Sequence, residues 1–197
     1  MKPPRGGVTN GIMRRFNNPN FHTRYFVGNG IDIGSGTDSI NNYKYMFPSI
    51  KSCREWDLKD GDATYMNGIE DNTFDFIHSS HCLEHLKEIY KGFENWVRIC
   101  KKDGYIITVV PDEDLYEQGN FPSIYNKQHI QTLTIYKKNS WSPKSINIFD
   151  LIMRFGDKIK VEKIELIYDR YNKDLYGKMD QSIIGAECSI EFIVRKL

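Results

Sequence analysis

The feature that most limits the fold of this chain is the segment Gly30-Ile31-Asp32-Ile33-Gly34-Ser35-Gly36, an apolar run with one acid that breaks into a glycine turn. Such a run is typical of a buried first strand in a parallel sheet, and its glycines let the chain turn tightly where a ligand approaches the backbone. Asp32 stands where a pyrophosphate would meet a negative charge. The turn therefore favours a cationic or amine-bearing ligand over a dinucleotide.

The composition is that of an ordinary folded domain. The chain has 197 residues, of which 40% are hydrophobic and 27% are charged, and its formal net charge is +1. A charge so close to zero argues against nucleic acid as a partner. No apolar run is long enough to span a bilayer, so no membrane partner is expected. Four scattered cysteines without a CxxC pair, and the lack of a hydrophobic signal segment, indicate a cytoplasmic protein.

The other periodic segments predict an α/β domain. Strands are expected at 50–56, 74–80, 105–110, 161–168 and 187–195, and helices at 83–102 and 142–156. The last two strands are expected to pair antiparallel. The result is a Rossmann-like, doubly wound, mostly parallel sheet with an antiparallel terminal strand as its reversed edge. That exposed edge can pair between two copies of the chain, which leaves a homodimer open.

The two ends of the chain and one internal stretch stand apart from this pattern. Residues 1–20 are rich in Pro, Gly, Asn and Arg and are expected to form a flexible arm, followed by a single domain over 21–197. The stretch 112–141 is polar and aromatic without a clear period. Since long irregular stretches in compact domains are usually functional, it is expected to be a lid or insert near the site.

Two motifs carry a resemblance to a known family. Asp-Ile-Gly-Ser-Gly at 32–36 resembles the first motif of class I S-adenosylmethionine (SAM)-dependent methyltransferases. The segment DFIHSSHCLEHL at 75–86 resembles the strand and helix start of their small-molecule, type 11 branch. Asp38 departs from the longer family pattern, which has a third glycine there. The resemblance implies SAM as the cofactor and S-adenosylhomocysteine (SAH) as the product.

The resemblance also implies which residues hold the cofactor beyond the carboxyl ends of the strands. It assigns Asp57 to the ribose hydroxyls and Asp62 to the adenine amino group, although only Leu58–Gly61 separates these acids where most relatives have a whole helix. Arg24 suits the carboxylate of SAM and Tyr25 its sulfonium, unless the two simply anchor the arm. The full expected set is Asp32, Gly34, Ser35, Gly36, Asp57, Asp62, Ala63, Ser79, Ser80, His81, Arg24 and Tyr25.

Methyl transfer to a neutral hydroxyl requires a base. His129 in the insert and His81 after the third strand are the leading candidates, because the pKa of an imidazole lies near neutral pH. Asp112 is a further candidate, with capping of the next helical turn as its competing role. His81 and His85 stand one helical turn apart, but no third ligand follows at a recognised spacing, so no metal is expected.

The acceptor is suggested by resemblance alone. The stretch 111–129 is similar to methyltransferases associated with bacterial surface-polysaccharide gene clusters. This similarity implies O-methylation of a sugar or of a sugar-linked phosphorus group, hence a small-molecule, carbohydrate-linked acceptor as the partner. Two alternatives stay open. One is a SAM-binding scaffold without catalysis, and the other is an NAD-dependent oxidoreductase, which Asp32 and the missing third glycine disfavour.

Overall fold

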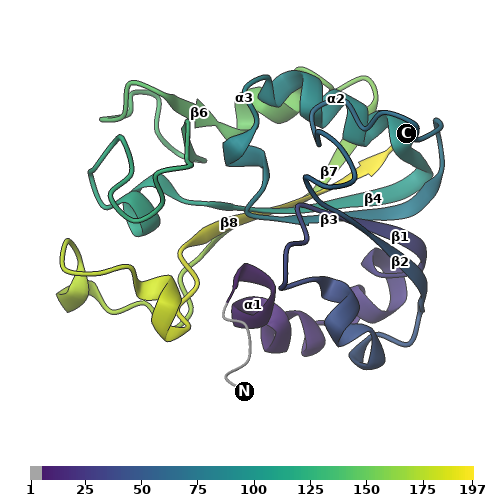
Figure 1. The fold of residues 1–197 in the computed structure, drawn as a ribbon, viewed down its shortest axis with the longest axis horizontal. Coiled ribbons are helices and arrows are strands. Elements are labelled where there is room, and N and C mark those ends of the chain that lie inside the picture. The colour runs from purple at the N-terminus through teal and green to yellow at the C-terminus, as the bar shows by residue number, and fades with distance from the viewer. Residues whose placement is uncertain (1–5) are drawn as a thin grey trace.

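The computed structural model describes residues 6–197 and is built around a six-stranded sheet (Figure 1). The strands are β1 (Gly28–Ile33), β2 (Ile50–Trp56), β3 (Phe74–Ser80), β4 (Cys100–Pro111), β7 (Ile159–Ile167) and β8 (Ser189–Lys196). Their order across the sheet is β2-β1-β3-β4-β8-β7. The first four strands are parallel, whereas β8 runs antiparallel to both β4 and β7. The predicted Rossmann-like, mostly parallel class of fold is confirmed.

The sequence suggested that the antiparallel strand lies at the edge of the sheet, but in the structure it does not. β8 is inserted between β4 and β7, and β7 forms the edge. Burial explains this order. The residues of β8 are buried from Ser189 to Val194, whereas in β7 only the terminal residues Ile159 and Ile167 are buried. A strand that is buried on both faces belongs in the interior of the sheet.

The remaining regular elements are short. The α-helices are α1 (Gly7–Phe16), α2 (Ile89–Ile99) and α3 (Ile148–Met153). Short stretches of 3-10 or π-helix are η1 (Phe21–Tyr25), η2 (Ile40–Met46), η3 (Leu83–His85), η4 (Glu113–Glu117), η5 (Lys173–Leu175) and η6 (Gln181–Ile184). Strands β5 (Thr132–Thr134) and β6 (Ser145–Asn147) form a separate small sheet. None of the helices within residues 6–197 is long and apolar enough to cross a membrane.

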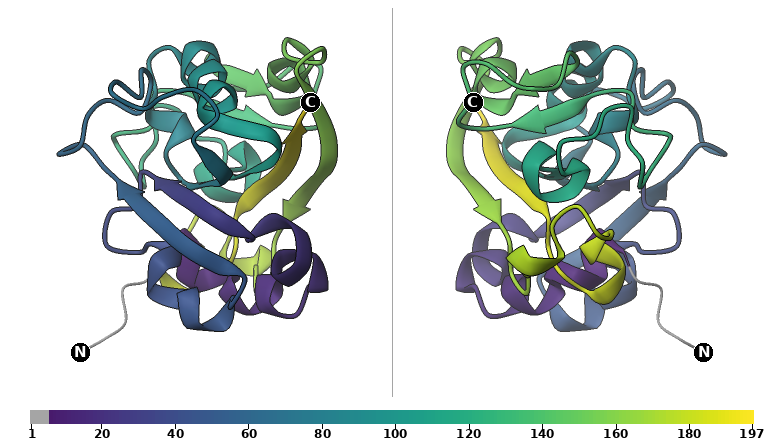
Figure 2. Two further views of the ribbon diagram at one scale, coloured as in Figure 1. Left: turned by 90° about the vertical axis from the view of Figure 1, so that its right-hand side faces the viewer. Right: turned by 90° about the vertical axis from the view of Figure 1, so that its left-hand side faces the viewer.

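Each face of the central sheet carries its own hydrophobic core. Helices α2 and α3 pack on one face, and α1 with the turns η1 and η2 packs on the other (Figures 1 and 2). The chain is therefore a three-layer α/β structure in which α1, at the N-terminus, lies near the segment that leads into β8 (Figure 1).

Residues 7–16 form a packed helix in place of the expected flexible arm. Val8 and Ile12, which are one turn apart on α1, are buried in the core. Arg15 is fully buried, and its Nε donates to Glu191 Oε2 of β8 at 3.1 Å. An apolar stripe and a buried ion pair thus fix a segment whose composition alone suggested disorder. Residues 1–5 of the expected arm lie outside the described residues.

Two predicted helices have different limits in the structure. The helix expected over 83–102 consists of η3 and α2 and ends at Ile99, because residues 100–102 already belong to β4. The helix expected over 142–156 is α3, which begins at Ile148 and is capped by Asn147, whose side chain accepts the N–H of Phe149 at 2.9 Å. Between 112 and 141 the chain is largely irregular, as expected, with η4 and β5 as its regular parts.

Candidate active site

The turn after β1 is fixed by the buried carboxylate of Asp32. Its Oδ1 lies 2.6 Å from Nδ1 of His78, the residue opposite it on β3, and its Oδ2 accepts the N–H of Ile40 at 2.8 Å. Ile40 begins η2, so Asp32 accepts a hydrogen bond from the N-terminus of the first helical turn after β1. Asp32 lines neither of the two cavities described below, and its contacts are those of a residue that shapes the turn.

A cavity of about 560 Å³, the larger cavity, lies beyond the carboxyl ends of β1 and β2. Gly34 forms part of its wall with a φ of +74°, and a Cβ at this position would lie 2.5 Å from Cβ of Cys82. Only glycine fits this position without moving its neighbour. Asp57, Asp62 and Ala63 line the same cavity from the loop after β2. With His81, which lines the same cavity, five of the predicted cofactor residues meet in one place.

Two tryptophans hold the loop that carries these acids. The indole Nε1 of Trp56 donates to the carbonyl of Gly61 at 3.1 Å, and that of Trp96 donates to the carbonyl of Ala63 at 2.9 Å. Between β2 and β3 the structure has turns and no helix, in agreement with the short Leu58–Gly61 linker. The indole contacts replace that helix as the support of the loop.

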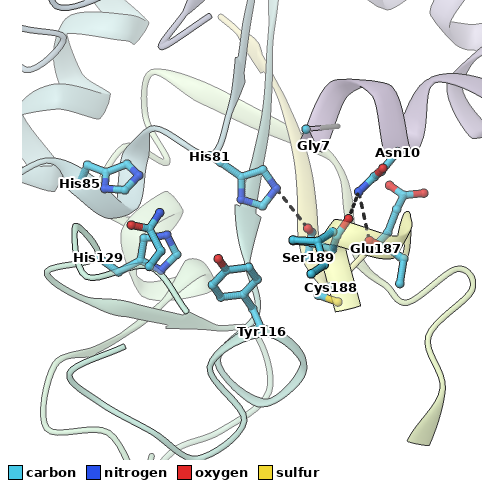
Figure 3. A pocket seen from close by; sticks show the side chains of 14 residues that line it. Gly7, Asn10, His81, His85, Tyr116, His129, Glu187, Cys188 and Ser189 are labelled. Carbon is cyan, nitrogen blue, oxygen red and sulfur yellow. Dashed lines mark hydrogen bonds between the residues drawn. The ribbon is translucent and has the colours of Figure 1, made fainter. Parts of the chain in front are cut away.

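A second cavity of about 290 Å³, the smaller cavity, adjoins the first (Figure 3). Its wall is built from four parts of the chain: Gly7 and Asn10 of α1, His81 and His85 around η3, Tyr116 and His129 of the insert, and Glu187, Cys188 and Ser189 at the start of β8. His81 and His85 line the larger cavity as well. The two cavities therefore meet at this pair of imidazoles.

Three histidines surround the carboxylate of Glu84. Oε1 of Glu84 lies 3.5 Å from His81 Nδ1, 3.8 Å from His85 Nε2 and 3.7 Å from His129 Nε2. Glu84 is fully buried, and neither of its side-chain oxygens has a hydrogen-bond partner among residues 6–197. Burial by itself raises the pKa of a carboxyl group, but the imidazoles, His81 foremost, outweigh this effect and lower the pKa of Glu84.

The far nitrogens of two of these rings are held by acceptors. His129 Nδ1 lies 2.5 Å from Glu117 Oε1, and His85 Nδ1 lies 3.0 Å from the carbonyl oxygen of Gln128. An acceptor at Nδ1 favours the tautomer with its proton there, which leaves the Nε2 lone pair directed towards Glu84. His81 is arranged the other way round. Its Nδ1 faces Glu84, and its Nε2 lies 3.4 Å from Ser189 Oγ at the smaller cavity (Figure 3).

The structure brings the two leading candidate bases together and leaves the third apart. His81 and His129 both line the smaller cavity, whereas Asp112 lines neither cavity. Asp112 Oδ1 accepts the N–H groups of Asp114 and Leu115 at 3.0 and 3.1 Å, which is the capping role that competed with catalysis. Burial raises the pKa of Asp112 to about 6.

The other predicted cofactor residues lie outside both cavities. Ser79 Oγ donates to the carbonyl of Ile33 at 2.9 Å, and Ser80, Ser35 and Gly36 border the turn without lining a cavity. Arg24 and Tyr25 come before β1 and so lie at the amino ends of the strands, away from both cavities. Arg24 donates to Glu162 at 3.0 Å and to the hydroxyl of Tyr105 at 3.2 Å. These contacts match the simple anchoring role.

Sequence reasoning missed the contribution of α1 and of the segment before β8 to the smaller cavity. Gly7 and Asn10 fell in the stretch expected to be a flexible arm, and Glu187 to Ser189 fell at the start of the strand expected over 187–195, so no pattern placed them at the site. The one local signal is Gly7, where a Cβ would lie 2.3 Å from His81 Cδ2. His78 was also missed, although a polar residue within a buried strand signals a partner on the next strand.

Comparison with known proteins finds a family resemblance over part of the chain. Residues 30–108 match the family model described as "Methyltransferase domain". The matched region runs from β1 into β4 and includes Gly34, Asp57, Asp62, the η3 turn and α2. No curated protein sequence matches the chain.

The whole chain resembles solved structures at low sequence identity. A chain from the complex between the Trm112 methyltransferase activator and a methyltransferase of Haloferax volcanii matches with a TM-score of 0.65 at 11% identity, covering 94% of this chain and 88% of that one. A SAM-dependent methyltransferase from Archaeoglobus fulgidus has a TM-score of 0.58 at 15% identity, over 96% and 93% of the two chains. One from Mesorhizobium loti has a TM-score of 0.55 at 10% identity, over 93% and 95%. At these identities the likeness shows the fold.

Proposed function

We propose that this protein, whose residues 30–108 match a methyltransferase domain and whose fold resembles that of SAM-dependent methyltransferases, moves a methyl group from SAM in the larger cavity to an acceptor in the smaller cavity. The observation that carries this proposal is the pair His81 and His85, which lines both cavities. Methyl transfer needs donor and acceptor in line and close together, and two cavities that share a wall meet this requirement. The domain match favours this function over the oxidoreductase alternative.

The proposed cofactor residues are those that were predicted from the sequence and that line the larger cavity. Asp57 can accept hydrogen bonds from the ribose hydroxyls, because a carboxylate offers two acceptor oxygens. Asp62 can accept a hydrogen bond from the adenine amino group, with Ala63 leaving room for the ring. Gly34 lets the backbone approach the methionine portion of SAM.

His81 is the base we assign to the reaction. Its Nε2 faces the smaller cavity, and the Glu84 carboxylate, whose Oε1 lies 3.5 Å from its Nδ1, can stabilise the ring by charge attraction once it is protonated. In the proposed step an acceptor oxygen forms a bond to the methyl carbon while the carbon–sulfur bond of SAM breaks. The hydroxyl proton passes to His81 Nε2, and neutral SAH is the second product.

The acceptor we propose is a hydroxyl group of a sugar or of a sugar-linked phosphorus compound, as in surface-polysaccharide biosynthesis. The smaller cavity has the dimensions of a small-molecule site and presents polar groups of Asn10, Asn126 and Glu187 that can bond to hydroxyls. The ring of Tyr116 in the same wall can pack on a sugar face. The similarity of the 111–129 stretch to polysaccharide-cluster methyltransferases supports the same class.

Calorimetry with SAH tests the cofactor assignment. We expect the protein to bind SAH with micromolar affinity, about −8 kcal/mol, and Asp62→Ala to weaken binding about tenfold, about 1.4 kcal/mol. Asp150→Ala is the matched control, since Asp150 is an exposed acid on α3 outside both cavities. If the folded protein does not bind SAH, the proposed function is wrong. If both variants bind equally well, SAH occupies another place.

A further inference from the structure

We propose that Glu84, His85 and His129 form a binding site for a divalent transition-metal ion, with Zn²⁺ as the best match, in the wall of the smaller cavity. One ligand atom from each residue lies within 4.8 Å of the others. The sequence analysis considered His81 and His85 and expected no metal. In the proposed site His85 is joined instead by Glu84 and by His129 of the insert. Metal binding does not depend on the proposed methyl transfer.

The strongest sign of a missing cation is the state of Glu84. Its carboxylate is fully buried, and neither oxygen has a hydrogen-bond partner in the described part of the chain. A buried carboxylate is costly unless it is paired or coordinates a metal. The contacts at 3.5 to 3.8 Å from the three imidazoles are too long for good hydrogen bonds. A cation between the carboxylate and the rings would satisfy the carboxylate at the place where the ring nitrogens converge.

The two histidine ligands are also oriented as metal ligands are. Metal-binding histidines almost always donate their other ring N–H to a carboxylate or to a backbone carbonyl. Both forms occur here, with Glu117 behind His129 at 2.5 Å and the carbonyl of Gln128 behind His85 at 3.0 Å. Each Nε2 therefore offers its lone pair on the side of Glu84.

The choice of metal follows from the donors and their spacing. Zinc binds imidazole nitrogen and carboxylate oxygen at about 2.0–2.2 Å, so two ligands of a tetrahedral ion lie about 3.4 Å apart. The distances from Glu84 Oε1 to the two Nε2 atoms are 3.8 and 3.7 Å, close to that spacing. The ligand atoms of the two histidines lie within 4.8 Å of each other, so the two rings must approach each other when the ion binds. Two nitrogen donors disfavour Ca²⁺ and Mg²⁺, which prefer oxygen.

The location of the site indicates its use. His85 and His129 line the smaller cavity, so a coordination position left open by three protein ligands can face that cavity. If the proposed methyl transfer holds, the ion would polarise the acceptor oxygen and lower the pKa of its hydroxyl, and His81 would then take the proton. This part of the inference rests on the proposed function.

Metal loading of tag-free protein tests the site without any methyl acceptor. After incubation with Zn²⁺ and removal of the excess, we expect close to one bound ion per chain, and Co²⁺ should give the visible absorption of a tetrahedral or five-coordinate site. Competition with a chromogenic chelator gives the affinity. We expect Glu84→Gln and His129→Gln to weaken Zn²⁺ binding at least about tenfold and Glu117→Gln to weaken it about 10–100-fold.

His22→Gln is the matched control, because His22 Nε2 contacts the carbonyl of Phe16 at 2.6 Å and the residue lines neither cavity. It should leave the zinc affinity unchanged. The proposal is overturned if the folded protein retains neither ion, or if the three site variants bind as tightly as the parent chain. Should Glu84→Gln fail to fold, His129→Gln and Glu117→Gln carry the test. SAH binding measured on the same samples separates this outcome from failure of the proposed function.

Discussion

His81 holds a backbone conformation that most side chains avoid. Its φ is +56°, and its N–H donates to the carbonyl of Val109 at 2.9 Å, so the residue is locked at the end of β3. Non-glycine residues in this region cost about 1–3 kcal/mol and gather at functional sites. The conformation directs the ring between the two cavities, where the proposed base must be.

Replacing His81 by Asn tests its catalytic role, since Asn tolerates positive φ. We expect SAH affinity to stay within a few-fold and methyl transfer to an acceptor found in a sugar panel to fall about 10²–10⁴-fold, which is the usual contribution of a general base. SAH production measures the rate. His22→Asn should match the parent protein. An unchanged rate in His81→Asn would move the role of base to another group, with His129 next in line.

Asp112 gives a prediction on stability. Burial raises its pKa from 3.8 to about 6, so the folded state holds a proton that the unfolded chain releases first. Asp112 therefore favours folding below about pH 4 and loses this contribution as the pH rises to about 6, a change of about 3 kcal/mol. Asn can still cap η4 but does not titrate. The free energy of unfolding of Asp112→Asn, minus that of the parent, should rise by this amount between pH 4 and 7. Parallel urea-unfolding profiles would contradict the shift.

At the scale of elements, α1 approaches the site so closely that its first residue must be glycine. A Cβ on Gly7 would lie 2.3 Å from His81 Cδ2 and 2.5 Å from Ser80 Oγ. We expect Gly7→Ala to lower the free energy of unfolding by about 1–3 kcal/mol, as overpacking does, although Ala is the better helix former. Urea unfolding measures it. In Gly156→Ala the nearest atom is 3.5 Å away, and stability should be unchanged or slightly higher.

The limits of the strands and helices show how much of the secondary structure could be predicted from the sequence. Strands β2 and β3 were predicted to the residue, because their ends coincide with Asp57 and with the polar turn after Ser80. The end of α2 was placed too late. Lys101 and Lys102 suit a helix C-terminus, but they lie in β4 between Cys100 and Tyr105, which pair with Phe74 and Phe76 of β3. Tertiary pairing overrides local preference in such cases.

The site residues that directly follow a strand could be predicted from the sequence. Those brought to the site by the folding of the irregular insert could not. Gly34, Asp57 and Asp62 come directly after strands, so a parallel sheet must bring them to one rim. His129 reaches Glu84 only because the insert folds around the buried carboxylate of Glu113. That carboxylate accepts hydrogen bonds from Lys137, Thr132, Ser140 and Ser145 at 2.6 to 3.0 Å. No local pattern encodes such a hub.

At the scale of the whole molecule, the carboxylate of Glu191 forms ion pairs between α1 near the N-terminus and β8 near the C-terminus. Glu191 of β8 is fully buried and contacts Arg14 and Arg15 of α1 at 2.9 and 3.1 Å, and Lys163 of β7 at 2.9 Å. Burial alone raises the pKa of a carboxyl, but these cations, Arg15 first, hold the pKa of Glu191 far below its ordinary value. Arg15 is fully buried and has Glu191 as its ion-pair partner. The layer that carries α1, and with it one wall of the smaller cavity, is thus fastened to the sheet through Glu191.

Glu191→Gln should therefore destabilise the protein by about 3–5 kcal/mol at neutral pH, because it leaves a buried arginine unpaired. Since the pKa of Glu191 is depressed in the folded state, its contribution is complete above the unfolded pKa of about 4.5 and declines as the pH falls below it. The difference between the two proteins in urea unfolding should be constant from pH 6 to 8 and shrink in acid. Glu94→Gln breaks an exposed pair with Lys158 and should cost less than about 1 kcal/mol. A loss equally small in Glu191→Gln would mean that apolar packing of Val8 and Ile12, and not the ion pairs, holds α1 on the sheet.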